Sequence, residues 1–423
     1  MPVWHGLTKE LVERGELVVV GITQEQHPDR CALFARWKGL GFPILWDPFN
    51  LTGIDAVPAL TAVDEHGIVR LTRPDPRRFQ EQIVEEFLGG RFEDDPGRAA
   101  PRAFRMSRGG VAGAAELERL RGRLGLPYGP RPDDAAAAST DRASSPEELF
   151  RAGVAARMDH DGPAPRPGDF QRAADLWQRA LAARPDQYVW RRRIQQWGPR
   201  LDKPYPFYDW VHGAAREIAA RGEEPVALRV PLSGAEVAGR SRAVPRGTAG
   251  EVEPDPDGLV ARDAGALVRV ETAVVLHTGA AGPNVRAPRG ASRIHVALRP
   301  REDAGWTPDA DPAELWLEVP EGWTSEARRA RFPAPDGDGD RAKRAPLSVD
   351  LEVSTPPVPL VPPVGAGAPP ASARLQGYVL YSVCEADGGC VFRRQDVEIV
   401  IQLPTPGAAG EGGQGRGGDD EDR

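Results

Sequence analysis

The stretch from Leu17 to Leu71 opens with Leu17-Val18-Val19-Val20-Gly21-Ile22 and contains Ala56-Val57-Pro58-Ala59 in its second half. The opening run is apolar and rich in β-branched residues, so it predicts a strand that is buried on both faces. A helical pattern follows from Asp29 to Leu40, where apolar residues recur three and four positions apart. This order of strand and helix is typical of an α/β domain.

The second half of the stretch has the pattern of a β-hairpin preceded by a proline. Strands are expected at Ala59 to Val63 and at Ile68 to Leu71, with Asp64-Glu65-His66-Gly67 as the turn between them. A proline cannot donate to a strand ladder, so Pro58 must mark a turn or a strand edge. A helix from Gln80 to Leu88 would then close the domain.

The order strand, helix, short strand, X-Pro, hairpin and helix resembles the thioredoxin fold, and in particular the redoxins of the TlpA and ResA type. The resemblance rests on Val57-Pro58, followed at once by the hairpin, and it covers about the first 90 residues. In that family the proline is cis and faces the active site. The resemblance therefore implies a cis Val57–Pro58 bond, with Val57 and Pro58 contacting the substrate.

One part of the family pattern is absent. The family's first strand and its Cys-x-x-Cys motif precede the first helix, yet Pro2 to Arg14 already has the pattern of that helix, and no Cys-x-x-Cys occurs in the sequence. We therefore expect an incomplete thioredoxin-like domain over residues 1–90. Either the true start lies upstream of Met1, which we favour, or the domain is degenerate.

Composition and charge bound the remaining possibilities. A length of 423 residues predicts two to four domains, and glycine and proline together make up more than a fifth of the chain. Residues 91–144 are expected to be a flexible linker and residues 405–423 a disordered acidic tail. A formal net charge of −8 argues against nucleic acid as the main partner. No apolar run reaches the ~20 residues of a membrane span, and no signal segment opens the sequence.

Residues 145–224 are predicted to form a helical module. Ser145-Pro146-Glu147-Glu148 has an N-cap serine, a proline at the first helical position and acids in the first turn. A second helix is expected from Phe170 to Arg184, and its small residues and closing proline resemble the second half of a tetratricopeptide repeat. Further helices are expected at Tyr188 to Trp197 and Pro206 to Arg221, which extends a single helical hairpin.

Aromatic and basic residues alternate at the end of this module, as in Tyr188, Trp190 and Trp197 beside Arg191, Arg192 and Arg193. One interpretation is a stacking surface for single-stranded nucleic acid. The other is a helical module that buries its aromatic rings beneath arginine side chains. The acidic total charge favours the second interpretation.

From about residue 225 to 404 the hydrophobic period changes to two, which predicts an immunoglobulin-like β-sandwich. The expected strands are separated by Gly, Pro and Asp turns. They are Val226–Val230, Leu267–Leu276, Ile294–Leu298, Leu315–Val319, Leu347–Val353, Leu375–Val383 and Val397–Leu403.

The last two expected strands flank Cys384-Glu385-Ala386-Asp387-Gly388-Gly389-Cys390. A hairpin with Asp387-Gly388-Gly389 at its tip can place the two cysteines opposite each other, within the Cα separation of about 5.5–6 Å that a disulfide requires. Two thiols without further cysteine or histidine at ligand spacing make only half of a zinc site, so neither a metal nor a cofactor is expected. The arrangement resembles the N-terminal immunoglobulin-like domain of the thiol-disulfide transporter DsbD, which implies that Cys384 and Cys390 are a redox pair.

The third cysteine, Cys31, lies near a helix start, where a thiolate is favoured, but it shares an apolar stripe with Phe34, which favours a buried structural thiol. The resemblances together imply a bacterial, extracytoplasmic thiol-disulfide oxidoreductase of the redoxin class that acts on a protein thiol or disulfide client. The alternative is a non-catalytic binding or scaffold protein, in which the thioredoxin-like domain is degenerate and the disulfide is a staple.

Overall fold

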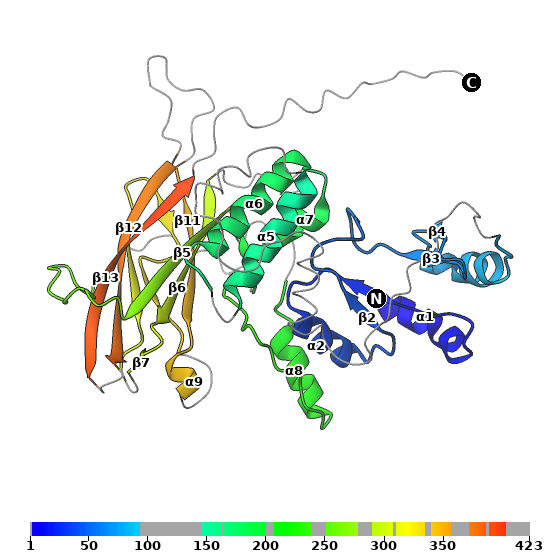
Figure 1. Ribbon diagram of the computed structural model, residues 1–423, viewed down its shortest axis with the longest axis horizontal. Helices are drawn as coiled ribbons and strands as arrows, with labels where there is room; N and C mark the ends of the chain where they lie inside the picture. The colour runs from blue at the N-terminus through cyan, green and yellow to red at the C-terminus, as the bar shows by residue number, and fades with distance from the viewer. Residues whose placement is uncertain are drawn as a thin grey trace, which may run out of the picture. The chain divides into compact units, whose positions relative to one another are not determined.

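The computed structural model describes residues 2–93, 145–162, 165–199, 207–237, 251–277, 290–307, 310–334, 340–356, 372–385 and 389–402 (Figure 1). Most of the expected linker and the expected tail lie outside these residues. The chain divides into two compact units, and each is described by itself. The first unit comprises residues 1–194 and 206–232, and the second comprises residues 195–205 and 233–423. Within the described ranges, no helix is both long and apolar enough to cross a membrane.

The first unit begins with an α/β segment. Helix α1 (Pro2–Glu13) is followed by strand β1 (Gly21–Thr23), helix α2 (Pro28–Lys38) and strand β2 (Ile44–Trp46). β1 and β2 pair in parallel, with Gly21 opposite Ile44. This parallel pair with an intervening helix matches the predicted α/β pattern.

The prediction that the run at 17–22 is buried on both faces is wrong. Val18, Val20 and Ile22 have exposed fractions of 79%, 46% and 47%, and the strand itself begins only at Gly21. Among the described residues, β1 pairs with β2 alone. The apolar side chains are exposed because this two-stranded sheet is too small to have two covered faces.

The Val57–Pro58 peptide bond is cis, as expected, and the predicted hairpin follows it. Strands β3 (Thr61–Val63) and β4 (Val69–Thr72) pair antiparallel with an irregularity near Val63. The Asp64 carboxylate fixes the turn by accepting hydrogen bonds from the backbone N–H groups of His66 and Ile68, at 3.0 and 2.8 Å. A 3-10 turn η1 (Pro76–Arg78) and a π-helix η2 (Gln80–Leu88) complete the segment.

Four further helices lie in the described residues from 145 to 220, and the last three residues of the third of them belong to the second unit. They are α5 (Pro146–His160), α6 (Asp169–Ala183), α7 (Tyr188–Trp197) and α8 (Val211–Ala220). α5 begins as the sequence predicts, with Ser145 and Glu148 forming a reciprocal capping box. α5 and α6 pack side by side, and Gly153 of α5 allows this because a Cβ there would lie 2.5 Å from Trp177 of α6.

The aromatic residues of α7 support the second interpretation of the aromatic and basic run. Trp190 and Trp197 are each 1% exposed, so their rings are not available for stacking with bases. Phe150 stacks on Trp190 at a centroid distance of 5.2 Å, and the Arg184 guanidinium lies 5.4 Å from the Trp190 ring centroid. Buried rings beneath arginine side chains are the arrangement expected of a structural module.

Residues 226–230 are not a strand of the sandwich, contrary to prediction. They belong to the first unit, where Val226 and Leu228 pack with Leu33 of α2 and Ile218 of α8. The alternation of apolar residues in this segment reflects one-sided packing against two helices rather than pairing with a strand. Short apolar runs do not distinguish these two situations.

The second unit contains two antiparallel sheets. The first has the strand order β5 (Val268–Leu276), β6 (Ala291–Pro300), β11 (Leu347–Ser354) and β9 (Thr324–Ser325). The second has the order β10 (Arg329–Arg331), β8 (Glu314–Glu318), β12 (Ser372–Glu385) and β13 (Cys390–Gln402), and β7 (Ala304–Trp306) also pairs with β12. A short helix, α9 (Asp340–Lys343), precedes β11.

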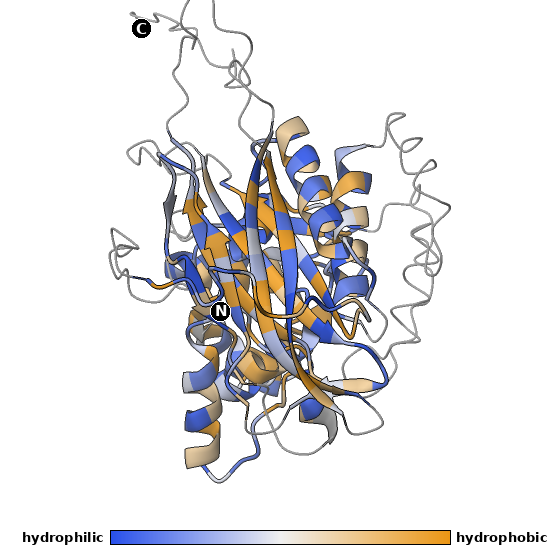
Figure 2. Cartoon of the chain, turned by 90° about the vertical axis from the view of Figure 1, so that its left-hand side faces the viewer, coloured by the Kyte–Doolittle hydropathy of each residue, from blue (hydrophilic) through white to orange (hydrophobic). Residues whose placement is uncertain are grey.

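One hydrophobic core joins the two sheets. It combines side chains such as Ile294 and Leu351 from the first sheet with Leu315, Val379 and Ile399 from the second. Figure 2 shows apolar and polar residues alternating along the strands, as expected when one face of each sheet is buried in a common core. The second unit is therefore a two-layer antiparallel structure, and all but the first of the strands expected from residue 225 onward are present in it.

Candidate functional site

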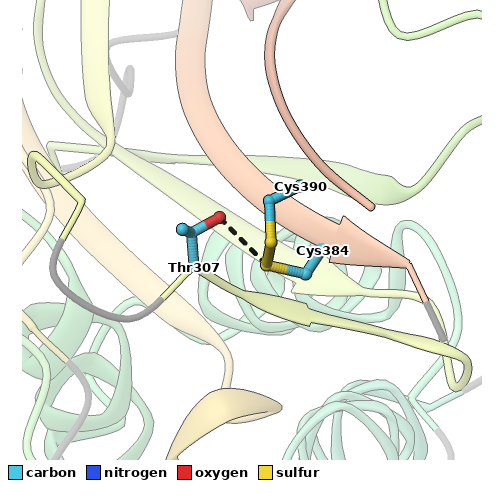
Figure 3. Close-up of a disulfide and its surroundings, with 3 residues drawn as sticks. All are labelled: Thr307, Cys384 and Cys390. Atoms are coloured by element: carbon cyan, nitrogen blue, oxygen red, sulfur yellow. Dashed lines mark hydrogen bonds between the residues drawn. A yellow bond between two sulfur atoms is a disulfide. The ribbon is translucent and has the colours of Figure 1, made fainter. Parts of the chain in front are cut away.

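Cys384 and Cys390 form a disulfide between β12 and β13 (Figure 3). The two residues are directly opposite each other in the antiparallel register, and their Cα atoms are 3.9 Å apart. The separation is smaller than the expected 5.5–6 Å because the hydrogen-bonded pair is the next one, with the Glu385 N–H donating to the Gly389 carbonyl at 2.8 Å. Residues at a non-hydrogen-bonded position approach more closely.

The disulfide lies on the outer face of its sheet. Val383 points into the core between the sheets, so its neighbour Cys384 points away from that core. Cys390 is exposed and Cys384 is half-buried. The pair is therefore accessible to a reagent from solution, and mainly on the side of Cys390.

Thr307 makes a polar contact to the sulfur of Cys384. Its Oγ1 lies 3.3 Å from the Sγ of Cys384, and Figure 3 marks this contact with a dashed line. Thr307 follows β7, and its backbone N–H donates to the carbonyl of Ser382 at 3.2 Å. This residue could not be found from the sequence, because a threonine 77 positions from the cysteine has no spacing signal of its own.

A charged cluster lies on the same sheet face but away from the disulfide, four residues along β13 from Cys390 and six residues along β12 from Cys384. The Arg394 guanidinium lies 3.6 Å from the Tyr378 ring centroid and binds the Asp255 carboxylate at 2.8 Å. Burial, followed by the neighbouring Glu253 carboxylate, raises the pKa of Tyr378 to about 12. This phenol therefore stays neutral at physiological pH, and the basic run after Cys390 is partly neutralised by its acidic partners.

Pro58 and Val57, the substrate-contacting residues that the redoxin resemblance implies, lie in the first unit. Val57 is 50% exposed, so the bond is accessible. The structure brings Cys384 and Cys390 together in the second unit, and it places Val57 and Pro58 on the hairpin segment of the first.

The surroundings of Cys31 disfavour its thiolate form. Its Sγ lies 3.1 Å from the Thr23 hydroxyl, on the first turn of α2. Burial, with a smaller contribution from the Glu25 carboxylate, raises the pKa of Cys31 to about 12. A thiol with this pKa carries almost no thiolate at neutral pH, although the helix N-terminus would favour one.

We expect native Cys31 to react with Ellman's reagent at pH 8 about 1,000-fold more slowly than in the unfolded chain. The reason is that moving the pKa from 9.0 to about 12 lowers the thiolate fraction by roughly that factor. The measurement compares the released thionitrobenzoate in buffer and in 6 M guanidinium chloride without reductant. Equal rates in the two solvents would contradict the burial of this thiol.

A buried ionic network, which sequence analysis missed, connects the α/β segment of the first unit with its helices. Asp161 accepts hydrogen bonds from Arg157 at 3.1 Å and from Gln26 at 3.2 Å, and it lies 3.4 Å from Nε2 of His27. Arg193 donates to the carbonyl of Gln24 and to the side chain of Gln26. Burial, and then the charges of three arginines, hold the pKa of His27 well below its usual value.

This network is a buried structural link between two parts of the first unit. His27 and Arg193 are each 6% exposed, so a solvent-borne substrate has little access to them. Across the described ranges, no three His, Cys, Asp or Glu side chains gather in a way that could hold a metal ion. Compared with known proteins, the chain matches no protein-family model and no curated protein sequence.

Proposed function

We propose that the protein is a thiol-disulfide exchange protein whose redox centre is the Cys384–Cys390 pair. The observation that carries this proposal is the position of the disulfide: it is accessible, on the outer face of a sheet, and joins two strands that are already paired over their whole length. A bridge between cysteines six positions apart closes a very short loop, so it constrains the unfolded chain less than a long-range bridge would. Because the bridge adds little to stability, a role in thiol-disulfide exchange explains its presence better than a structural role does.

The reaction uses a client protein with two thiols. A client thiolate attacks one sulfur of the bridge, the Cys384–Cys390 bond breaks, and a mixed disulfide forms. The second client thiolate then attacks the client's sulfur in that mixed disulfide. The products are an oxidised client and two reduced cysteines, so two electrons pass from the client to this protein, and the reverse sequence reduces a client disulfide.

The wider architecture fits this proposal. The cis Val57–Pro58 bond followed by a hairpin supports a thioredoxin-like domain of the redoxin class, in which Val57 and Pro58 would contact a client backbone. The α5–α6 pair supports a tetratricopeptide-like hairpin, and the two antiparallel sheets support an immunoglobulin-like sandwich of the DsbD type. Because disulfides persist mainly in oxidising compartments, the proposed site of action is outside the cytoplasm.

The test is the reduction potential of the pair. We expect a value above about −300 mV, because inert structural bridges lie below that potential. The protein is equilibrated with glutathione buffers of graded ratio, quenched with acid and alkylated, and the state of each cysteine is read by peptide mass spectrometry. The variant C384S/C390S is the control: it should remain folded with a small fall in melting temperature.

The opposite result has a definite meaning. A pair that stays fully oxidised under strong reductant would favour the binding or scaffold protein, in which the bridge is a staple. One observation favours the binding or scaffold protein. The polar residues that follow β1, Gln26 and His27, contact the buried Asp161, so they serve as internal structural links rather than as a site for a client.

A further inference from the structure

The hydroxyl of Thr307 must be the donor in its contact with Cys384. A disulfide sulfur carries no hydrogen, so the 3.3 Å contact between Oγ1 and Sγ in the oxidised protein is a hydrogen bond from threonine to sulfur. When the bridge opens, the same hydroxyl faces a sulfur with a full negative charge. Hydrogen bonds to charged groups are roughly twice as strong as those to neutral groups.

The position of Thr307 is fixed by its neighbours. Its backbone N–H bonds to Ser382, and the preceding Trp306 is 8% exposed with its indole N–H donating to the Ala345 carbonyl at 2.7 Å. The side chain before it is therefore anchored in the core, and the hydroxyl needs little reorganisation to act. A preorganised donor of this kind stabilises charge that develops in a transition state.

The two cysteines differ in their surroundings. At the level of the bridge, β12 is an inner strand, with Gly305 of β7 opposite Cys384 on one side and Cys390 of β13 on the other. β13 is the last strand in the order of this sheet. Cys390 is the more exposed residue, whereas Cys384 is half-buried beside Thr307.

We propose that Thr307 is a catalytic residue of the exchange reaction: its hydroxyl stabilises Cys384 as the leaving thiolate while a client thiolate attacks Cys390. This inference rests on the proposed function. The client sulfur forms a bond to Sγ of Cys390, the bond between Sγ of Cys390 and Sγ of Cys384 breaks, and its electron pair remains on Cys384. The Thr307 hydroxyl keeps its proton and donates a hydrogen bond, so no further acid or oxidant is required.

The experiment compares T307V, which keeps the shape but removes the hydroxyl, with T307S, which keeps the hydroxyl. Reduced glutathione is the probe. The rate of opening of the oxidised protein is followed after acid quenching, and peptide mapping locates the glutathione adduct on Cys384, Cys390 or Cys31. We expect T307V to open about tenfold more slowly and T307S to open at close to the original rate, since a hydrogen bond to a charged group contributes at least this factor.

The position of the glutathione adduct distinguishes the two roles of Thr307, because a purely structural role would not change which cysteine carries the adduct. In the original protein it should lie on Cys390, and in T307V a larger share should lie on Cys384. T324V is the matched control, because Thr324 is an exposed threonine of β9 in the other sheet, and it should leave both rate and adduct unchanged. Melting curves of all variants verify folding.

The outcomes separate this inference from the proposed function. If the bridge opens readily and T307V matches the original protein in rate and adduct position, the role of Thr307 is overturned while the exchange function stands. If neither glutathione nor dithiothreitol opens the bridge in the original protein, both proposals fail. A slow T307S variant would also overturn the inference, because the hydroxyl alone would then be insufficient.

Discussion

Replacement of Gly153 by valine is expected to destabilise the first unit by about 3 kcal/mol, a large part of the stability of an ordinary domain. A Cβ at this position would lie 2.5 and 2.6 Å from two atoms of the Trp177 indole and 3.1 Å from the Ala173 carbonyl oxygen. Trp177 is 1% exposed and cannot move aside without disturbing α6. Added volume in a close-packed helix contact therefore forces the helices apart.

Hydrogen exchange measured by mass spectrometry gives the opening free energy of α5 and α6 in the intact chain. The matched control is G213A, because Gly213 lies within α8 and a Cβ there would meet no atom within 4 Å. This control should stabilise its helix by about 0.5–1 kcal/mol through helix propensity and reduced entropy of the unfolded chain. Protection of α5 unchanged by G153V would show that α5 and α6 are not in close contact.

Replacement of Asp350 by alanine is expected to destabilise the second unit by about 3–5 kcal/mol. Asp350 is a buried carboxylate of β11, and its side chain is 3% exposed. It is paired with Nδ1 of His295, its register partner on β6, and accepts a hydrogen bond from the Ala235 N–H at 2.9 Å. Removal of the carboxylate leaves Nδ1 of the buried His295 without this partner and the nearby Arg293 without this counter-charge.

The same pair makes the second unit sensitive to acid. Burial alone would raise the pKa of Asp350, but the attraction of His295 and Arg293 and the hydrogen bonds it accepts lower it to about 2. A carboxyl whose folded pKa is below its unfolded value of 3.8 contributes stability above pH 4 and loses it as the pH falls toward 2. The shift corresponds to roughly 2 kcal/mol.

Chemical unfolding between pH 2 and pH 7, followed through the exchange protection of β6 and β11, measures this contribution. D350A should show a weaker dependence on pH in the window from 4 to 2 than the original protein. The control is D303A, because Asp303 is 56% exposed in its ion pair with Arg301, so solvent screens this pair and the substitution should leave the acid dependence close to that of the original protein. Equal acid sensitivity in D350A would show that other carboxyls determine the loss of stability.

Local signals in the sequence were sufficient for much of the fold. The serine cap of α5, the turn after β3 and the cysteine hairpin each depend on a few neighbouring residues, and the structure has all three. The cysteine pair was predictable because two flanking strands place the cysteines opposite each other, while residues 386–388 of the predicted hairpin tip lie outside the described residues. Short-range chemistry of this kind can be interpreted without knowing the tertiary contacts.

The features that depend on distant contacts could not be predicted. Strand β10 has the sequence Arg329-Ala330-Arg331, which contains no strand signal, and its pairing with β8 is accompanied by an ion pair between Arg329 and Glu314 at 2.6 Å. For Val18 and Val20 the sequence has a strand signal, but the predicted burial of their side chains is wrong. A strand pattern predicts burial only if a neighbouring layer covers the strand. The contact between Thr307 and Cys384 could not be predicted either, since it depends on β7 pairing with β12.

The ionic network around Asp161 has a consequence for how this chain can change during evolution. Gln26 and Asp161 are 135 residues apart in the sequence, and Arg193 is 167 residues from Gln26, yet each satisfies the other's buried polar groups. A substitution at one of these positions leaves a desolvated partner at another, so neutral drift at either is restricted. The α/β segment and the helices are separable by sequence pattern, but these contacts tie them together, and recombination between residues 93 and 145 would mismatch their buried hydrogen-bond partners.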